Sequence, residues 1–142
     1  MQYYPEELKN GHKLTYDQYQ QGLERGELPG LKCNSCNNVT FPPMMRCREC
    51  SGTDLEITQI AGEGTIRTFT VIRVAPEGMT APYVVAMAEI DEGPWVMGNL
   101  VDLNPDDADM NLIGKRVTLG SQIVKGGTYS QGDSRVITFS LM

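Results

Sequence analysis

The residues of this chain with the clearest chemistry are its four cysteines, which form two Cys-x2-Cys pairs. Cys33 and Cys36 make the first pair, Cys47 and Cys50 make the second, and ten residues separate the pairs. Two such pairs can bring four thiolates around one ion, and a tetrahedron of soft sulfur ligands suits zinc. Because thiolates fill every ligand position, no place is left for water or substrate. We therefore expect one structural Zn2+ rather than a catalytic ion.

The alternative for the same cysteines is two disulfides or free thiols. The first residues have neither the basic flank nor the apolar core of a secretory signal peptide, so we expect a cytoplasmic protein, in whose reducing surroundings disulfides are rare. The net charge of -6 disfavours general binding to nucleic acid or to anionic membranes. No apolar run approaches the roughly 20 residues needed to cross a bilayer, which indicates a soluble chain.

Catalytic groups are hard to find elsewhere in the sequence. The one histidine, His12, lies among polar residues near the N-terminus, whereas nucleophilic catalysis needs a serine or cysteine beside an oriented base. Asp91 and Glu92 fall in a predicted tight turn, where adjacent carboxylates point apart and stay solvated. We therefore predict that this polypeptide is not an enzyme by itself.

Three basic residues, Lys32, Arg46 and Arg48, lie within or beside the cysteine pairs. Such a group could hold a few phosphates of a nucleotide-like group, although each cation alone is also what a solvated surface carries. Three cations are too few for a groove that binds single-stranded nucleic acid, which needs a basic track with stacking aromatic rings.

A short amphipathic helix is predicted before the first cysteine pair. Thr15 and Gln18 have the spacing of a capping box, and Gly26 can end the helix. An apolar stripe on this helix suits core packing or a partner interface, and the tyrosines of the preceding arm suit a frayed terminus or an anchor on a partner. The candidates for a partner interface are Tyr3, Tyr4, Tyr16, Tyr19 and Leu23.

After the second cysteine pair, short β-branched and aromatic runs predict strands. A lead-in strand is expected over residues 55–60, with a bulge or sharp bend at Gly62 and Gly64. The acidic run 104–109 lacks the alternating spacing of a calcium loop and is interpreted as a solvated connection, and glycines make 125–133 a hairpin loop. Five further strands are expected over residues 65–74, 83–90, 95–101, 115–124 and 135–141.

These patterns predict a mainly β protein in three parts. An N-terminal arm and helix occupy residues 1–30, and a rubredoxin-like zinc ribbon with four cysteines occupies residues 31–53. A C-terminal five-stranded barrel of the OB type, with Greek-key connections, occupies residues 54–142.

The order of these pieces resembles a known family. The helix, the two cysteine pairs with Phe41-Pro42-Pro43 between them, and the later run Ala81-Pro82-Tyr83-Val84-Val85-Ala86 are similar to small zinc-ribbon plus OB-fold proteins that accompany thiolases and other acyl-CoA enzymes. The resemblance covers residues 15 to about 124. It implies that the four cysteines are zinc ligands.

The resemblance also implies a non-catalytic subunit in a hetero-oligomer with a thiolase-like protein, with coenzyme A or acyl-CoA at or near the interface. From charge alone, our hypothesis is that Lys32, Arg46 and Arg48 contact the phosphates of coenzyme A. We favour a partner that acts on an aromatic 3-oxoacyl-CoA such as benzoylsuccinyl-CoA, in aromatic degradation. One alternative is a stand-alone acyl-CoA-binding protein. Another is an OB protein that binds single-stranded nucleic acid.

Overall fold

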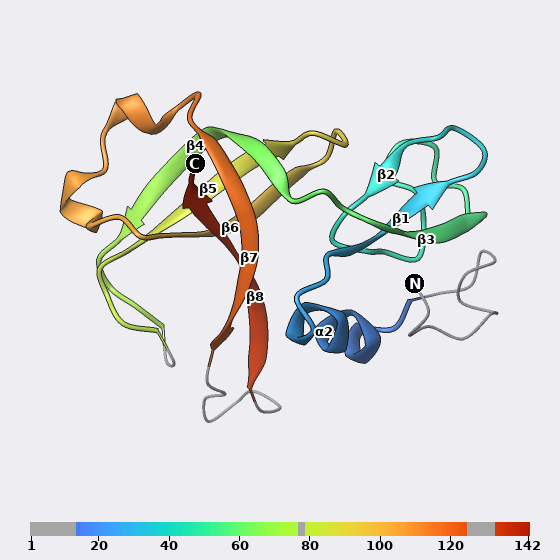
Figure 1. Ribbon diagram of the computed structural model, residues 1–142, viewed down its shortest axis with the longest axis horizontal. Helices are drawn as coiled ribbons and strands as arrows, with labels where there is room; N and C mark the ends of the chain where they lie inside the picture. Colours follow the sequence, from blue (N-terminus) through green and yellow to red (C-terminus); the bar gives the residue numbers. More distant parts are fainter. Residues whose placement is uncertain (1–13, 77–78, 125–132) are drawn as a thin grey trace. The chain divides into compact units, whose positions relative to one another are not determined.

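The structure, a computed structural model, describes residues 14–76, 79–124 and 133–142, and its contacts separate into two units (Figure 1). The first unit runs to Ala61 and includes Glu92–Pro94, and the second contains Gly62–Asp91 and Trp95–Met142. The arm before residue 14, with Tyr3, Tyr4 and His12, lies outside the described residues, as does the loop predicted at 125–133 except for its last residue. In the described part of the chain, no helix is both long and apolar enough to cross a membrane.

The first unit begins with helix α2 (Tyr16–Glu24), whose N-terminal cap matches the prediction. Thr15 Oγ1 accepts a hydrogen bond from the Gln18 amide at 3.2 Å, and Gln18 Oε1 accepts one from the Thr15 amide at 3.0 Å. This reciprocal pair satisfies two amides that have no partner inside the helix. The capping box is confirmed.

Helix α2 ends where Gly26 adopts a left-handed conformation, with φ of +82°. The Gly26 amide donates to the Leu23 carbonyl at 3.0 Å, and the Glu27 amide donates to the Gly22 carbonyl at 2.9 Å. These two bonds form a Schellman motif, which satisfies the last carbonyls of a helix and favours glycine at this position. The predicted stop at Gly26 is confirmed.

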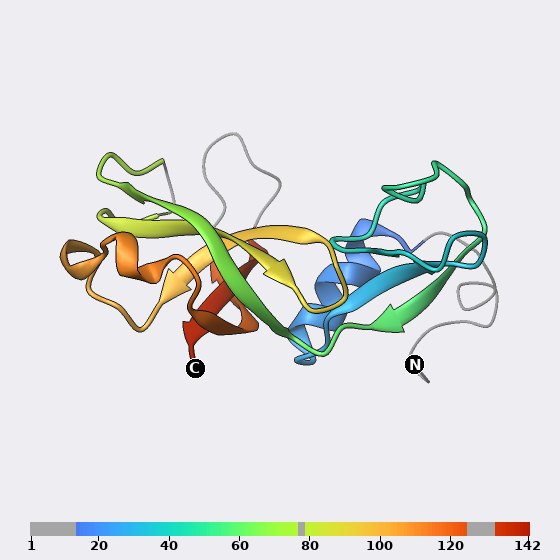
Figure 2. The same ribbon diagram turned by 90° about the horizontal axis from the view of Figure 1, so that it is seen from above.

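Three short strands form the sheet of the first unit. They are β1 (Pro29–Cys33), β2 (Val39–Thr40) and β3 (Leu55–Gln59), paired antiparallel in the order β2-β1-β3. Helix α2 lies beside β1 in both views (Figures 1 and 2). The helix and the ribbon therefore fold as parts of one unit.

Strand β3 belongs to the ribbon and not to the barrel. Leu55 lies opposite Cys33 and Ile57 lies opposite Leu31, and all four side chains are buried. The predicted boundary between residues 53 and 54 assigned this strand to the barrel domain, whereas the two units divide after Ala61. The alternating pattern identified a strand but could not identify its partner, because pairing depends on residues far away in the sequence.

Five strands form the closed barrel of the second unit (Figure 2). Their order around the barrel is β4-β5-β6-β8-β7, with parallel pairing only between β6 and β8. This topology confirms the predicted five-stranded OB-type barrel. The strands are β4 (Glu63–Ile72), β5 (Tyr83–Ile90), β6 (Trp95–Val101), β7 (Arg116–Val124) and β8 (Ser134–Leu141).

The acidic connection between β6 and β7 contains two short 3-10 turns, η1 (Pro105–Asp107) and η2 (Met110–Leu112). The Asn104 side chain accepts from the amide of Asp106 at 3.0 Å, and the Asp109 carboxylate accepts from the amide of Asn111 at 2.9 Å. The side chains of Asn104 and Asp109 thus cap the N-termini of the two turns.

The bulge in β4 lies later than predicted. Register shifts between Ile66 and Thr68, so Arg67 is the extra residue, and its guanidinium pairs with Glu89 at 2.9 Å. Gly64 is not part of this bulge. It allows the two strands to approach closely, because a Cβ at this position would lie 2.8 Å from the Glu89 carbonyl oxygen. The glycine is explained by close backbone approach, which the sequence pattern did not separate from a bulge.

Candidate metal centre

The four cysteine side chains converge on one point between the two knuckles of the ribbon. All four Sγ atoms lie within 4.8 Å of one another. The Sγ atoms of Cys33 and Cys50 are 3.6 Å apart, and those of Cys36 and Cys47 are 3.5 Å apart. Zinc–sulfur bonds of about 2.3 Å in a tetrahedron place neighbouring sulfurs about 3.8 Å apart. The donor set and its spacing therefore fit one Zn2+ held by the four predicted ligands.

The same turn builds both knuckles. The Asn37 amide donates to the Cys33 carbonyl at 2.9 Å, and the Ser51 amide donates to the Cys47 carbonyl at 3.1 Å. Asn37 and Ser51 both have positive φ, 65° and 62°, a conformation that asparagine tolerates better than most residues. Each turn directs the side chains of its two cysteines to the same side.

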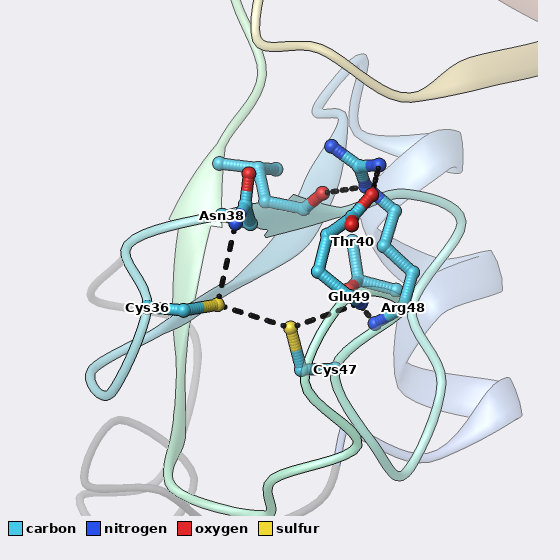
Figure 3. Close-up of polar contacts among 7 residues, drawn as sticks. Cys36, Asn38, Thr40, Cys47, Arg48 and Glu49 are labelled. Atoms are coloured by element: carbon cyan, nitrogen blue, oxygen red, sulfur yellow. Dashed lines mark hydrogen bonds and ion pairs between the residues drawn. The ribbon is translucent and has the colours of Figure 1, made fainter.

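Hydrogen bonds to sulfur stabilise the thiolate form of the first knuckle. The backbone amide of Cys36 lowers the pKa of the Cys33 thiol. The Asn38 side chain lowers the pKa of the Cys36 thiol, and its Nδ2 lies 3.3 Å from the Cys36 Sγ (Figure 3). In zinc sites, such partners of the ligands orient them and tune their basicity.

Four thiolates in this space repel one another unless a cation lies between them. The Gly52 amide lowers the pKa of Cys50, but contacts with the Cys33 and Cys36 thiols, together with burial, raise that pKa to about 12. Bound zinc would offset about half of this negative charge and keep all four ligands deprotonated. The chemistry of the donor set thus agrees with its geometry.

The ligands also form part of the hydrophobic core of the first unit. Cys33 and Cys47 are buried in one cluster with Leu31, Leu55 and Ile57. Cys36 is half-buried and Cys50 is exposed, but a site whose four ligand positions are all filled by sulfur leaves no open position for chemistry. We assign the metal to holding the ribbon in shape.

Arg48 links β2 to the second knuckle. Its backbone amide donates to the buried Thr40 hydroxyl at 3.1 Å, its Nε donates to the Val39 carbonyl at 2.7 Å, and its guanidinium pairs with Glu49 (Figure 3). The Glu49 amide in turn lies 3.4 Å from the Cys47 Sγ. Arg48 is therefore already used in the structure of the ribbon.

The other two predicted cations are exposed. Arg46 donates to the Ser51 carbonyl at 3.0 Å. Lys32 lies on β1 directly opposite Glu56 of β3, so an acidic residue is its cross-strand neighbour. The prediction that Lys32, Arg46 and Arg48 contact coenzyme A phosphates stays a prediction, and Arg48 is the least available of the three.

The predicted interface residues of helix α2 differ in burial: two are in the core and one is exposed. Tyr19 packs edge-to-face on Phe41 with ring centroids 6.2 Å apart, and burial, with the nearby Tyr16, raises its pKa to about 12. Leu23 is 2% exposed, whereas Tyr16 is 65% exposed. We therefore assign Tyr19 and Leu23 to the core of the first unit, and Tyr16 remains an interface candidate.

Sequence reasoning missed two residues that support the site. Asn38 follows the first knuckle directly, so an amide side chain two residues after a cysteine was a local signal that could have identified it. Thr40 offers no such signal, because its bond to the Arg48 amide joins residues eight positions apart.

Comparisons with known proteins agree with both units. Residues 20–56 match the family model described as the rubredoxin-like zinc ribbon domain of ChsH2, and residues 58–121 match its C-terminal OB-fold domain. The chain is 33% identical over 130 residues to a DUF35 domain-containing scaffold protein of Methanocaldococcus jannaschii. The aligned region covers 89% of this chain and 87% of the relative.

Two more distant likenesses concern enzyme complexes. The chain is 25% identical over 73 residues to the benzoylsuccinyl-CoA thiolase subunit BbsA of Thauera aromatica, which is 51% of each chain. A solved structure named Ltp2-ChsH2(DUF35) aldolase superposes with a TM-score of 0.66 at 24% identity, over 90% of this chain and 96% of that chain. The structural likeness shows a shared fold.

Proposed function

Because the chain belongs to the DUF35 family of zinc-ribbon and OB-fold proteins, we propose that it is a scaffold subunit that holds an enzyme of acyl-CoA chemistry. The observation that carries this proposal is the 33% identity to a DUF35 scaffold protein over most of both chains. The distant similarity to a thiolase subunit supports a thiolase-type enzyme as the partner. The resulting assembly would be a hetero-oligomer.

In this proposal the chain is not catalytic by itself. Its four cysteines are directed to one closed metal site, where thiolates occupy every ligand position. The nucleophile and the acid–base groups would come from the partner. The ribbon, kept rigid by zinc, and the closed barrel would supply two stable surfaces for assembly.

We further propose that the ribbon contacts coenzyme A through Lys32 and Arg46. Both side chains are exposed, and a cation at the surface attracts the negative charge of a phosphate. We expect Lys32→Ala combined with Arg46→Ala to weaken coenzyme A binding by the assembled complex, measured by calorimetry. Lys115→Ala, an exposed lysine of the barrel unit, is the control. Equal affinity in all variants would refute the contact.

The decisive experiment is purification of the tagged chain from its native host, with zinc measured alongside. We expect a stoichiometric thiolase-type partner, thiolysis activity only in the complex and one zinc per chain. Recovery of the chain alone with bound acyl-CoA, or with nucleic acid, would overturn the scaffold assignment.

The substrate can be tested with the same complex. The similarity to BbsA supports an aromatic 3-oxoacyl-CoA such as benzoylsuccinyl-CoA. We expect faster thiolysis of an aromatic than of a short aliphatic 3-oxoacyl-CoA. The opposite preference would exclude the aromatic assignment while leaving the scaffold role unaffected.

A further inference from the structure

The outer face of strands β5 and β6 is apolar where a solvent-facing sheet is usually polar. In β5 the core-facing residues alternate with Tyr83, Val85, Met87 and Glu89, and in β6 they alternate with Trp95, Met97, Asn99 and Val101. Glu89, at the end of β5 and opposite Trp95, is the one charged residue of this outward set. Antiparallel sheets with one solvated face normally place polar residues on it. We call the outward residues Tyr83, Val85, Met87, Trp95, Met97 and Asn99 the β5–β6 face.

Strand register joins these side chains into one surface. Met87 lies opposite Met97 and Val85 lies opposite Asn99, and cross-strand partners share a face of the sheet. Trp95 is 54% exposed and Met97 is 62% exposed. The barrel therefore presents protruding apolar side chains that its own core does not use.

A hollow of about 390 Å³ adjoins this surface. Tyr83, Val85, Met97 and Asn99 line it, and its other walls include Met79 and Val136. None of the lining residues carries a charge. The hollow and the protruding side chains are thus parts of one uncharged apolar surface.

We propose that the β5–β6 face with this hollow is the surface on which the barrel docks the enzyme subunit, an inference that rests on the proposed scaffold function. A partner that fits carries an uncharged apolar patch, with one side chain that enters the hollow and a recess that receives Met97 and Trp95. Tryptophan, tyrosine and methionine are enriched in the centres of protein interfaces, and charged residues are depleted there.

The shape and the charge favour this occupant over the others. A small ligand lies in a hollow and is largely enclosed, so it would leave Trp95, which does not line this hollow, in water. A nucleic-acid strand needs clustered cations, whereas the charged residues at the end of this face, Arg67 and Glu89, neutralise each other at 2.9 Å. The barrel is closed, so docking through side chains replaces strand addition at an edge.

The test compares two methionine variants of the full chain. Met97→Lys places a charge in the centre of the β5–β6 face, and Met110→Lys places the same charge on η2, where Met110 is 73% exposed and does not line the hollow. Met97→Leu keeps the face apolar. Unfolding curves establish first that each variant is folded.

With the purified partner enzyme, we expect Met97→Lys to raise the dissociation constant at least about tenfold, as truncation at an interface centre does. Met110→Lys and Met97→Leu should bind as the unmodified chain does. Equal binding by both lysine variants would overturn the docking surface and leave the scaffold function intact. A β5–β6 face that instead joins two copies of this chain, seen as a dimer that Met97→Lys dissociates, would also overturn it. If no enzyme partner binds the unmodified chain, the proposed function itself fails.

Discussion

Loss of one zinc ligand should unfold the ribbon and leave the barrel folded. We choose Cys33→Ser, because Cys33 is fully buried at the end of β1 and its Sγ faces that of Cys50 at 3.6 Å. A serine hydroxyl is a poor ligand for zinc at neutral pH, because the metal prefers a thiolate. The substitution also places a hydroxyl among apolar side chains.

The expected loss of stability on losing zinc is large because the hydrophobic core of the first unit is small. Its six large aliphatic and phenylalanine side chains stabilise the fold by about 1.5–3 kcal/mol each, or roughly 9–18 kcal/mol together. A structural zinc contributes about 10–16 kcal/mol, which is of the same order. Loss of the metal therefore removes a contribution as large as that of the apolar core, and we expect the unit to unfold without it. The six side chains are Leu23, Leu31, Phe41, Leu55, Ile57 and Ile60.

Hydrogen exchange of the full chain, combined with a zinc assay, measures both effects. In Cys33→Ser we expect less than one zinc per chain, exchange in the β1–β3 amides faster by several orders of magnitude, and unchanged protection of the β4–β8 amides. Ser35→Ala lies in the same knuckle, exposes no new group and should behave as the unmodified chain does. Protected β1–β3 amides in a zinc-free Cys33→Ser variant would show that apolar packing alone suffices and would refute the reasoning.

Three further predictions concern residues around the metal and the helix. Asn38→Ala removes the amide that donates to Cys36 Sγ at 3.3 Å and should weaken zinc affinity about 10–100-fold in a chelator competition assay, while an unchanged affinity would deny the bond a role. Thr15→Ala breaks the capping box with Gln18 and should lower the free energy of unfolding by about 0.5–2 kcal/mol. Thr15→Ser, which keeps the hydroxyl, is its control. Burial and the nearby Tyr16 raise the pKa of Tyr19 from 10.0 to about 12. The protonated Tyr19 side chain therefore contributes fully to the free energy of unfolding below pH 10, and this contribution is lost as pH rises from 10 to 12. Tyr19→Phe should remove this alkaline loss of up to roughly 3 kcal/mol, and a loss that persists in Tyr19→Phe would assign it to other groups.

The metal site could be predicted from the sequence because local turns determine it. Each Cys-x2-Cys pair is brought together by a turn within a few residues, so spacing alone identifies the ligands. The bonds that fix Arg48 are different, since the Val39 carbonyl and the Thr40 hydroxyl come from another strand. From the sequence pattern alone, Arg48 is indistinguishable from any other surface cation.

The barrel strands could be predicted for a similar reason, and the pairing of β3 could not. β-branched and aromatic runs of the right length mark strands whatever their partners are. Whether Leu55 and Ile57 pack on the barrel or on the ribbon depends on β1, more than twenty residues earlier. The sequence offers the same alternating pattern for both outcomes.

The apolar character of the β5–β6 face could not be predicted from the sequence pattern. The same face also differs from the core in that the fold does not depend on it. When both faces of a strand are apolar, period-two alternation disappears and the sequence indicates only a strand, as it did for Tyr83–Ile90. The core needs only the inward set, whose members Val84, Ala86 and Ala88 are at most 1% exposed. The outward set is not required to close the barrel, because backbone hydrogen bonds around the ring do that. Polar substitutions of the exposed Trp95 and Met97 should therefore leave the free energy of unfolding nearly unchanged, and a large loss of partner binding in the same variants would assign these side chains to recognition.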